Sequence, residues 1–227
     1  MKIRIKLKSP LLLGSGEGWG TFVDTDIVFD EYGLPYFPGK RLKGMLRESA
    51  EEVIDMFRYS QIDWLDKRIS DPSKAETIVE TIFGKNGFSE GIVRIDNLYL
   101  KDYEETLEWI KWAVNNYGGI VTKEDILETM TEVRQHTSIS SDGIAKEKSL
   151  RSVRVLKDKY EFEGDVGFDS KDVALIELLA LACANLRHVG SKRTRGFGEI
   201  TCSLCDSNNQ DISESVVERL KEVVSIV

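Results

Sequence analysis

Apolar and polar residues alternate along the first segment of the chain. Over residues 2–8, three aliphatic side chains alternate with four basic ones. This period of two predicts a β-strand with one buried face and one basic, open face. Shorter extended segments are predicted at 22–30, 92–100 and 162–168, and a last strand at 199–204. The pattern is typical of short strands in a sheet that is buried on one side.

A longer period marks three helices. In residues 38–59 the apolar side chains recur at the spacing of one helix face, and Pro38-Gly39 opens the segment. Residues 172–187 are almost all apolar, which predicts a helix buried on most sides. A closing helix is predicted at 212–226, because a capping-box pattern precedes a regular apolar stripe.

Two further segments interrupt this core. Residues 102–133 have the pattern of one or two amphipathic helices with an acidic surface, split near 116–119. Residues 134–164 read as a long basic β-hairpin, since Asp142-Gly143 is turn chemistry between two strand-prone arms. We therefore expect a helical insertion at about 102–133 and a protruding, thumb-like hairpin at about 134–164.

The order of the remaining elements indicates the fold class. It is strand, helix, strand, strand, helix, strand. This order predicts an α+β protein with a ferredoxin-like (RNA-recognition-like) antiparallel sheet, helices on one face and the other face free. No second unit of this kind is visible, so we expect a single domain over residues 1–227.

Composition narrows the cellular setting. The apolar fraction of 41% is enough for a core, and no run reaches the roughly 18 apolar residues of a membrane span. The N-terminus alternates and has no apolar signal-peptide block, so we expect a cytoplasmic protein that does not contact a membrane. Cys183, Cys202 and Cys205 are too few for a disulfide framework, and Cys202 and Cys205 lack a second ligand pair, so no metal centre is predicted from them.

The distribution of charge matters more than its sum. A net charge of −8 argues against nucleic-acid binding by bulk charge. Residues 40–47 and 187–195, however, carry four basic groups each and no acid, and 134–159 is also basic. The acid excess lies elsewhere, mainly at 102–132. Basic islands on an acidic body indicate a defined groove for a polyanion.

Glycine-rich loops lie beside these basic islands. Glycines permit close backbone approach and positive φ, and a helix N-terminus with basic side chains is a phosphate site. The loop glycines are Gly14, Gly16, Gly18, Gly190, Gly196 and Gly198. The residues predicted to bind phosphates of a polyanion are Lys40, Arg41, Lys43, Arg47, Arg151, Arg154, Lys192, Arg193 and Arg195.

Four of these segments resemble the RAMP superfamily, the RNA-binding proteins of CRISPR systems. The block 33–47 is similar to that family's strand-to-helix entry, and Ile82-Phe83-Gly84 with the strand at 94–96 is similar to its middle element. The hairpin 134–164 resembles the thumb of backbone subunits. The loop Gly190-Ser-Lys-Arg-Thr-Arg-Gly-Phe-Gly198 resembles the glycine-rich loop that defines the superfamily.

The resemblance implies a backbone subunit of a type III effector complex. Such a subunit binds CRISPR guide RNA and target RNA and assembles with other RAMP subunits and with copies of itself. Its hairpin wedges into the guide–target duplex, and an aspartate beside the wedge cuts target RNA with the help of Mg²⁺. Asp24 is nearest to that aspartate in this sequence, and Asp26 is the alternative.

Three other functions stay open at this point. Residues 23–30 also resemble a non-catalytic capping subunit that binds the 5′ handle of the guide. His136 or His188 would serve as general acid or base in a guide-processing endoribonuclease of the same superfamily. A ferredoxin-like module that mediates only protein contacts would bind no RNA at all.

Overall fold

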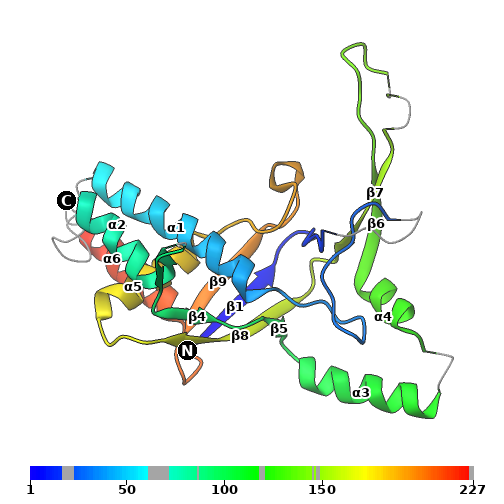
Figure 1. Ribbon diagram of the computed structural model, residues 1–227, viewed down its shortest axis with the longest axis horizontal. Helices are drawn as coiled ribbons and strands as arrows, with labels where there is room; N and C mark the ends of the chain where they lie inside the picture. Colours follow the sequence, from blue (N-terminus) through cyan, green and yellow to red (C-terminus); the bar gives the residue numbers. More distant parts are fainter. Residues whose placement is uncertain are drawn as a thin grey trace.

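The structure is a computed structural model that describes residues 1–16, 23–60, 72–85, 87–117, 121–144, 146 and 149–224. Strands and helices follow one another along the chain (Figure 1). In order, they are β1 (Lys2–Leu7), α1 (Gly39–Ser60), α2 (Pro72–Phe83), β2 (Gly84–Lys85), β3 (Ser89–Glu90), β4 (Val93–Ile95), β5 (Tyr99–Leu100), α3 (Tyr103–Asn116), α4 (Lys123–Met130), β6 (Thr131–His136), β7 (Arg151–Leu156), β8 (Glu161–Phe168), α5 (Val173–Asn185), the 3₁₀ helix η1 (Arg193–Arg195), β9 (Ile200–Cys205) and α6 (Ile212–Val224).

The central sheet has the strand order β4-β8-β1-β9, and β5 also pairs with β8. Every pairing in it is antiparallel. β1 lies in the middle, with Ile5 opposite Phe162 of β8 and Cys202 of β9. The core elements β1, α1, β4, β8, α5 and β9 follow one another as predicted. The α+β, ferredoxin-like fold is therefore confirmed.

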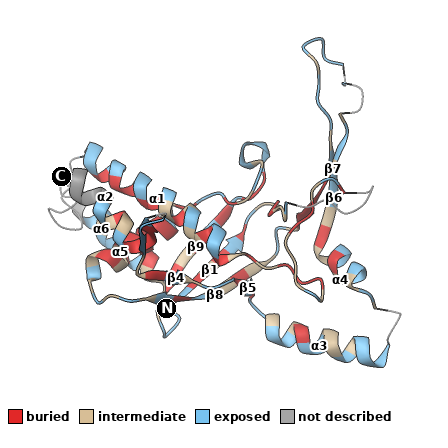
Figure 2. Cartoon of the chain, in the orientation of Figure 1, coloured by how far each residue is buried: buried red, intermediate tan, exposed pale blue. Residues whose placement is uncertain are grey.

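Helices α1 and α5 pack together on one face of the sheet, and α6 packs against α5 and β9. The apolar side of β1 faces this layer, so Ile3 and Ile5 are fully buried. Leu42 and Leu46 come from α1 with the helical spacing that the sequence showed. Buried residues are concentrated between the helices and the sheet (Figure 2). Because α5 is covered by α1, α6 and β9, its sequence is apolar on most sides.

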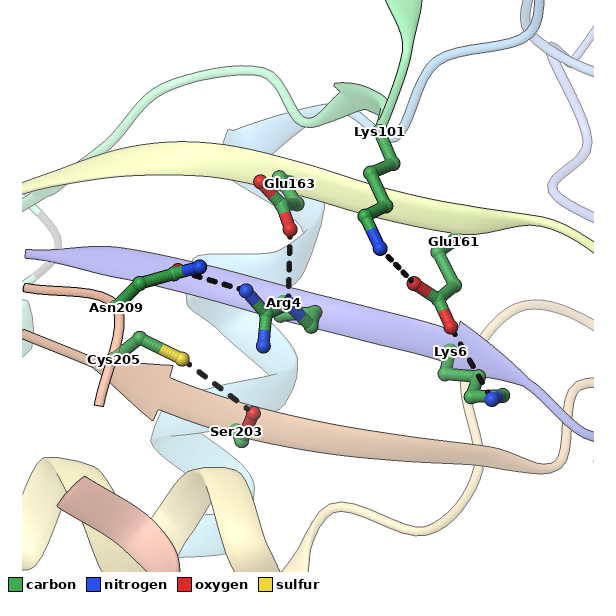
Figure 3. A network of polar contacts seen from close by, with 8 residues as sticks. All are labelled: Arg4, Lys6, Lys101, Glu161, Glu163, Ser203, Cys205 and Asn209. Carbon is green, nitrogen blue, oxygen red and sulfur yellow. Dashed lines mark hydrogen bonds and ion pairs between the residues drawn. The ribbon is translucent and has the colours of Figure 1, made fainter. Parts of the chain in front are cut away.

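The other face of the sheet carries a network of opposite charges, shown in Figure 3. The Arg4 guanidinium lies 2.9 Å from the Glu163 carboxylate, and Glu161 lies 3.3 Å from Lys6 and 3.5 Å from Lys101. The sequence predicted a basic open face for β1, but β8 supplies carboxylates directly opposite its basic residues. Partly exposed ion pairs of this kind each contribute only about 0–1 kcal/mol to stability. Their main effect is to neutralise this face as a binding surface for polyanions.

The two predicted interruptions of the core are present. Helices α3 and α4 form the insertion, separated near the residues where the sequence predicted a break. β6 and β7 pair from Thr131 opposite Leu156 to His136 opposite Arg151, and the hairpin projects from the body (Figure 1). Its boundaries differ from the prediction, because β6 begins at Thr131 and residues 161–164 belong to β8 of the central sheet. The hairpin therefore ends at β7.

The sequence predicted no membrane span, and the helices of the structure can be compared with that prediction. Within the described ranges, no helix is both long enough and apolar enough to cross a bilayer.

Candidate nucleic-acid interface

The extended segment Leu11–Gly14 forms hydrogen bonds with both basic regions, the start of α1 and the loop 190–198. On one side, the Leu11 carbonyl accepts the Leu156 N–H at 2.9 Å and the Leu13 carbonyl accepts the Val28 N–H at 3.1 Å. On the other side, the Leu12 carbonyl accepts the Ser191 N–H at 2.9 Å, and the Gly14 carbonyl accepts from the Arg41 guanidinium at 2.5 Å. Carbonyls two residues apart in an extended chain point the same way, about 7 Å from each other. The start of α1 and the loop 190–198 therefore lie beside one another.

Loop 190–198 depends on glycine at two close approaches. Gly190 and Gly198 have φ values of 78° and 73°. A Cβ atom on Gly198 would lie 1.9 Å from the Val189 carbonyl oxygen, and one on Gly190 would lie 2.6 Å from the Leu12 carbonyl oxygen. Only glycine avoids both the strained φ and these clashes. The loop is thereby held against the body, while Arg193 and Arg195 of η1 stay exposed to solvent.

Positive side chains gather where loop 190–198 meets the base of the hairpin. The His136 ring packs edge-on against Phe197 at 5.8 Å, and the Arg134 guanidinium lies 5.5 Å from the centre of the same ring. Burial, together with Lys192, Arg195 and Arg134, lowers the pKa of His136. Burial and Arg195 also lower the pKa of Lys192. We call Arg134, His136, Lys192 and Arg195 the cationic cluster; the charges of Arg134, Lys192 and Arg195, and of His136 when it is protonated, repel one another, and a bound anion relieves that repulsion.

The cationic cluster includes two residues that were not among the predicted RNA-binding residues. Arg134 was not singled out in the sequence, and His136 was considered only as a general acid or base, because the strand in which both stand has no glycine or helix start near it. The signal that was available is Phe197, an aromatic residue inside the glycine-rich loop. It is buried with Leu12, Val153 and Val155, and so ties the loop to the hairpin.

His136 gives a testable dependence of stability on pH. Its pKa is lower in the folded chain than the ordinary value of about 6.5, so the unfolded chain binds its proton more readily. This contribution to stability is complete above about pH 6.5 and is lost as the pH falls below it. We expect His136→Gln to flatten the decrease in the free energy of unfolding between about pH 6.5 and 5. Urea denaturation at several pH values measures it, and equal slopes for variant and wild type would contradict it.

The four basic residues at the start of α1 divide into two groups. Lys40 and Arg41 are exposed, and Arg41 is the one that reaches segment Leu11–Gly14. The Lys43 amine donates to the Val93 carbonyl at 2.8 Å, and burial lowers its pKa. The Arg47 guanidinium donates to the Gly84 carbonyl at 2.9 Å and pairs with Glu51 at 3.1 Å. Lys43 and Arg47, predicted to bind RNA, therefore hold α1 to the strands beside it.

A cleft of about 340 Å³ lies along α1 and is bounded at one end by Arg193 of loop 190–198. Its lining includes Arg187, His188 and Arg193 from the chain after α5, but also Glu48 and Glu52 from α1. The sequence predicted a defined groove for a polyanion between the basic islands at 40–47 and 187–195. This cleft lies beside the middle of α1 and its α1 side is acidic, so it is not that groove; Lys40, Arg41 and the cationic cluster lie outside it.

The two candidate aspartates occupy different environments beside β7. The Asp24 side chain is 45% exposed; its Oδ2 accepts the Ser152 N–H at 2.7 Å, and its Oδ1 lies 3.7 Å from Arg151. Asp26 and Arg154 form an ion pair at 3.1 Å, with both side chains only 6% exposed. Asp24 is therefore accessible to a substrate, whereas Asp26 is a buried structural residue.

Arg151 and Arg154 of β7, both predicted to bind RNA, differ in exposure to solvent. The Arg151 side chain is 64% exposed at the end of β7. Arg154 is 5% exposed, and its guanidinium faces Asp26 and the Thr131 hydroxyl inside the molecule. The prediction that Arg154 contacts RNA is replaced by a structural role, because a phosphate cannot reach it in this arrangement.

The remaining predicted residues are the loop glycines Gly14, Gly16, Gly18 and Gly196. Gly14 bridges to Ile27, and Gly16 has a φ of 90°. Gly18 lies outside the described residues. Gly196 ends η1 with a φ of 78°. In the described part of the chain, no group of three or more His, Cys, Asp or Glu side chains is placed to hold a metal ion.

Comparisons with known proteins agree with this geometry. A family model described as the RAMP superfamily matches residues 4–201. A chain in the solved structure "Cryo-EM structure of the Type III-B Cmr-beta bound to cognate target RNA" is 14% identical, with a TM-score of 0.57 over 88% of this chain and 95% of that one. A chain in "Type III-B Cmr-beta Cryo-EM structure of the Apo state" is 15% identical, with a TM-score of 0.58 over 93% and 96%. A search of curated proteins finds no match. At these identities the solved structures share the fold.

Proposed function

Because the chain belongs to the RAMP superfamily, we propose that it is an RNA-binding subunit of a type III CRISPR effector complex. One observation carries the proposal: the cationic cluster and η1 gather basic side chains at the point where two loops converge on segment Leu11–Gly14. Within the described residues, the Lys192, Arg193 and Arg195 side chains make no ion pair with an acid. Chains of the same fold belong, by their titles, to Type III-B Cmr-beta structures, one of them bound to cognate target RNA.

The proposed RNA contacts are to the backbone. Exposed Arg41, Arg193 and Arg195 meet phosphates, and Lys192 and Arg134 complete the positive surface. Contacts of this kind position an RNA strand without reading its sequence. Such contacts suit a protein whose specificity comes from base pairing between a guide RNA and a target RNA. The further proposed partners are other RAMP subunits and copies of this chain.

The hairpin supports the assignment to a backbone subunit. Ile139, Ile144 and Leu150 lie beyond the paired arms of the hairpin, and their side chains are 65%, 68% and 56% exposed. Exposed aliphatic side chains on a projecting hairpin are suited to insert between base steps as apolar wedges. We assign the hairpin to the guide–target duplex. A capping subunit is the second candidate, because residues 23–30 resemble that type.

Cleavage of target RNA is the enzymatic part of the proposal, with Asp24 as its residue. The reaction is attack of an RNA 2′-hydroxyl on the adjacent phosphate; the hydroxyl loses its proton, the bond from phosphorus to the 5′-oxygen of the next nucleotide breaks, and the products are a 2′,3′-cyclic phosphate and a 5′-hydroxyl. The Ser152 N–H orients the Asp24 carboxylate, and exposed Arg151 lies beside it, within reach of a phosphate. Mg²⁺ is commonly held by one or two carboxylates plus substrate phosphates, and exposed Asp24 fits as one such ligand. Bound there, the ion would neutralise charge developing on the phosphate.

Binding of single-stranded RNA tests the proposal. We expect the purified chain to bind RNA, with the logarithm of the affinity falling linearly as the logarithm of the salt concentration rises. Three or more phosphate contacts give a slope of about −2 or steeper. Filter binding from about 0.05 to 0.3 M salt measures the slope. The absence of binding at physiological salt would contradict the proposal and favour a module that contacts only proteins.

A further inference from the structure

Helix α3 presents a row of aromatic rings to solvent. The side chains of Trp109, Trp112 and Tyr117 are 63%, 51% and 50% exposed. Their rings contact one another edge to face, at 5.9 Å between the two tryptophans and 5.7 Å between Trp112 and Tyr117. Large aromatic side chains exposed together, rather than singly, mark interaction surfaces.

The helix cannot bury this row by rotating. Leu107 is 9% exposed on the side that faces the body, and the Tyr103 hydroxyl donates to the Asp30 carboxylate at 2.8 Å. At 3.6 residues per turn, Trp109 and Trp112 lie about 200° and 140° around the helix from Leu107. The contacts that anchor α3 therefore hold the aromatic row outward.

The surroundings of the row are acidic. The segment 102–132 contains eight carboxylates and two lysines, an excess that accounts for most of the net charge of −8. Glu105 is exposed and stands on the same stripe of α3 as Trp109 and Trp112, at i, i+4 and i+7. α3 also projects to the side of the molecule away from the hairpin and the loop between α5 and β9 (Figure 1).

We infer that the outward face of α3 is a docking site for another protein that presents a basic segment. Tryptophan faces attract Lys and Arg side chains, and carboxylates beside them add charge complementarity. Tryptophan and tyrosine are also the residues that contribute most to binding at protein interfaces. This site is separate from the proposed RNA surface and does not depend on it.

Charge disfavours two other occupants of this face. RNA phosphates are repelled by the carboxylates of the segment 102–132. A second copy of this chain is disfavoured at this face because its net charge is −8 and its main group of basic side chains, the cationic cluster, is the surface proposed to bind RNA; copies would contact each other elsewhere. A basic protein segment meets both the charge and the aromatic rings.

Photo-crosslinking in the cells that make the protein tests the inference. The photo-reactive residue benzoyl-phenylalanine replaces Trp112, and adducts are mapped by mass spectrometry. We expect an adduct to a peptide of another protein with net positive charge, reduced about tenfold or more by Glu105→Lys in the same chain. The same photo-reactive residue in place of Phe88, which is 84% exposed, is the control and should not give this adduct.

Each other outcome overturns the inference. These outcomes are an adduct to RNA, an adduct to another copy of this chain, an adduct to a neutral or acidic peptide, the absence of any adduct, and an adduct that Glu105→Lys leaves unchanged. RNA binding by the Glu105→Lys variant is measured in parallel. We expect it to match the wild type, so failure of the docking site and failure of the RNA surface are distinguished.

Discussion

Reversing the charge of Lys192 and Arg195 should weaken RNA binding about 10²- to 10³-fold near physiological salt. The double variant Lys192→Glu/Arg195→Glu removes two phosphate contacts and places carboxylates at the same points. It should also reduce the magnitude of the salt slope by about 1.4, because each contact with a single strand contributes about 0.7. Filter binding at several salt concentrations measures both quantities.

The folded state should tolerate this change. Arg195 is exposed, Lys192 is half-buried, and both lie in a positive environment that lowers the pKa of Lys192. Removing positive charge there relieves repulsion, so we expect unchanged or slightly higher thermal stability. Lys171→Glu is the control for a charge reversal outside the site, because Lys171 is exposed just before α5; it changes the net charge by −2, against −4 for the double variant. An equal loss of affinity in Lys171→Glu would show that overall charge, and not this site, governs binding.

Substitution of Asp24 should lower the rate of RNA cleavage, whereas substitution of Asp26 should lower the stability of the fold. We expect Asp24→Ala to lower cleavage of complementary RNA by about 10²- to 10⁴-fold, because loss of a carboxylate that holds the metal ion removes several kcal/mol of charge stabilisation. Asp24 is partly exposed and makes one backbone hydrogen bond and a long ion pair, so stability should fall by at most about 1 kcal/mol. Cleavage by the assembled complex measures the first effect. Asp142→Ala, at the exposed hairpin turn, is the control. Full cleavage by assembled Asp24→Ala would remove Asp24 from the mechanism.

Asp26→Ala should instead destabilise the fold. It leaves the Arg154 guanidinium buried without its carboxylate, and breaking a buried ion pair in this way costs about 3–5 kcal/mol. Replacing both partners, as in Asp26→Ala/Arg154→Met, should restore most of the loss because no buried charge remains. Chemical denaturation measures the free energies of unfolding. Equal stability of Asp26→Ala and wild type would contradict the structural role of Asp26.

Local periodicity was enough to predict the ferredoxin-like core. The alternation in 2–8 fixes which side of β1 faces the helices, and the almost uninterrupted apolar run in α5 reflects its cover on several sides. The partners of the polar side of β1 could not be predicted. Glu161 and Glu163 lie more than 150 residues away, and only the register of β1 with β8 brings them opposite Lys6 and Arg4.

Among the site residues, charge alone was a poor guide to exposure. Arg151 and Arg154 are three residues apart, and in a strand this spacing places side chains on opposite faces. The alternation was therefore a signal that only one of them is exposed, and the structure places Arg154 inside. Lys43 and Arg47 are different, because carbonyls of β4 and β2 accept from them through contacts 50 and 37 residues apart in sequence.

The most direct test of the account is ultraviolet crosslinking of bound RNA, with the crosslinked residues identified by mass spectrometry. The account predicts crosslinks at Arg41, at His136 and within 192–195, where the loops meet beside segment Leu11–Gly14. Crosslinks confined to the ion-paired open face of the sheet, at Lys2, Lys6 and Lys101, would contradict it.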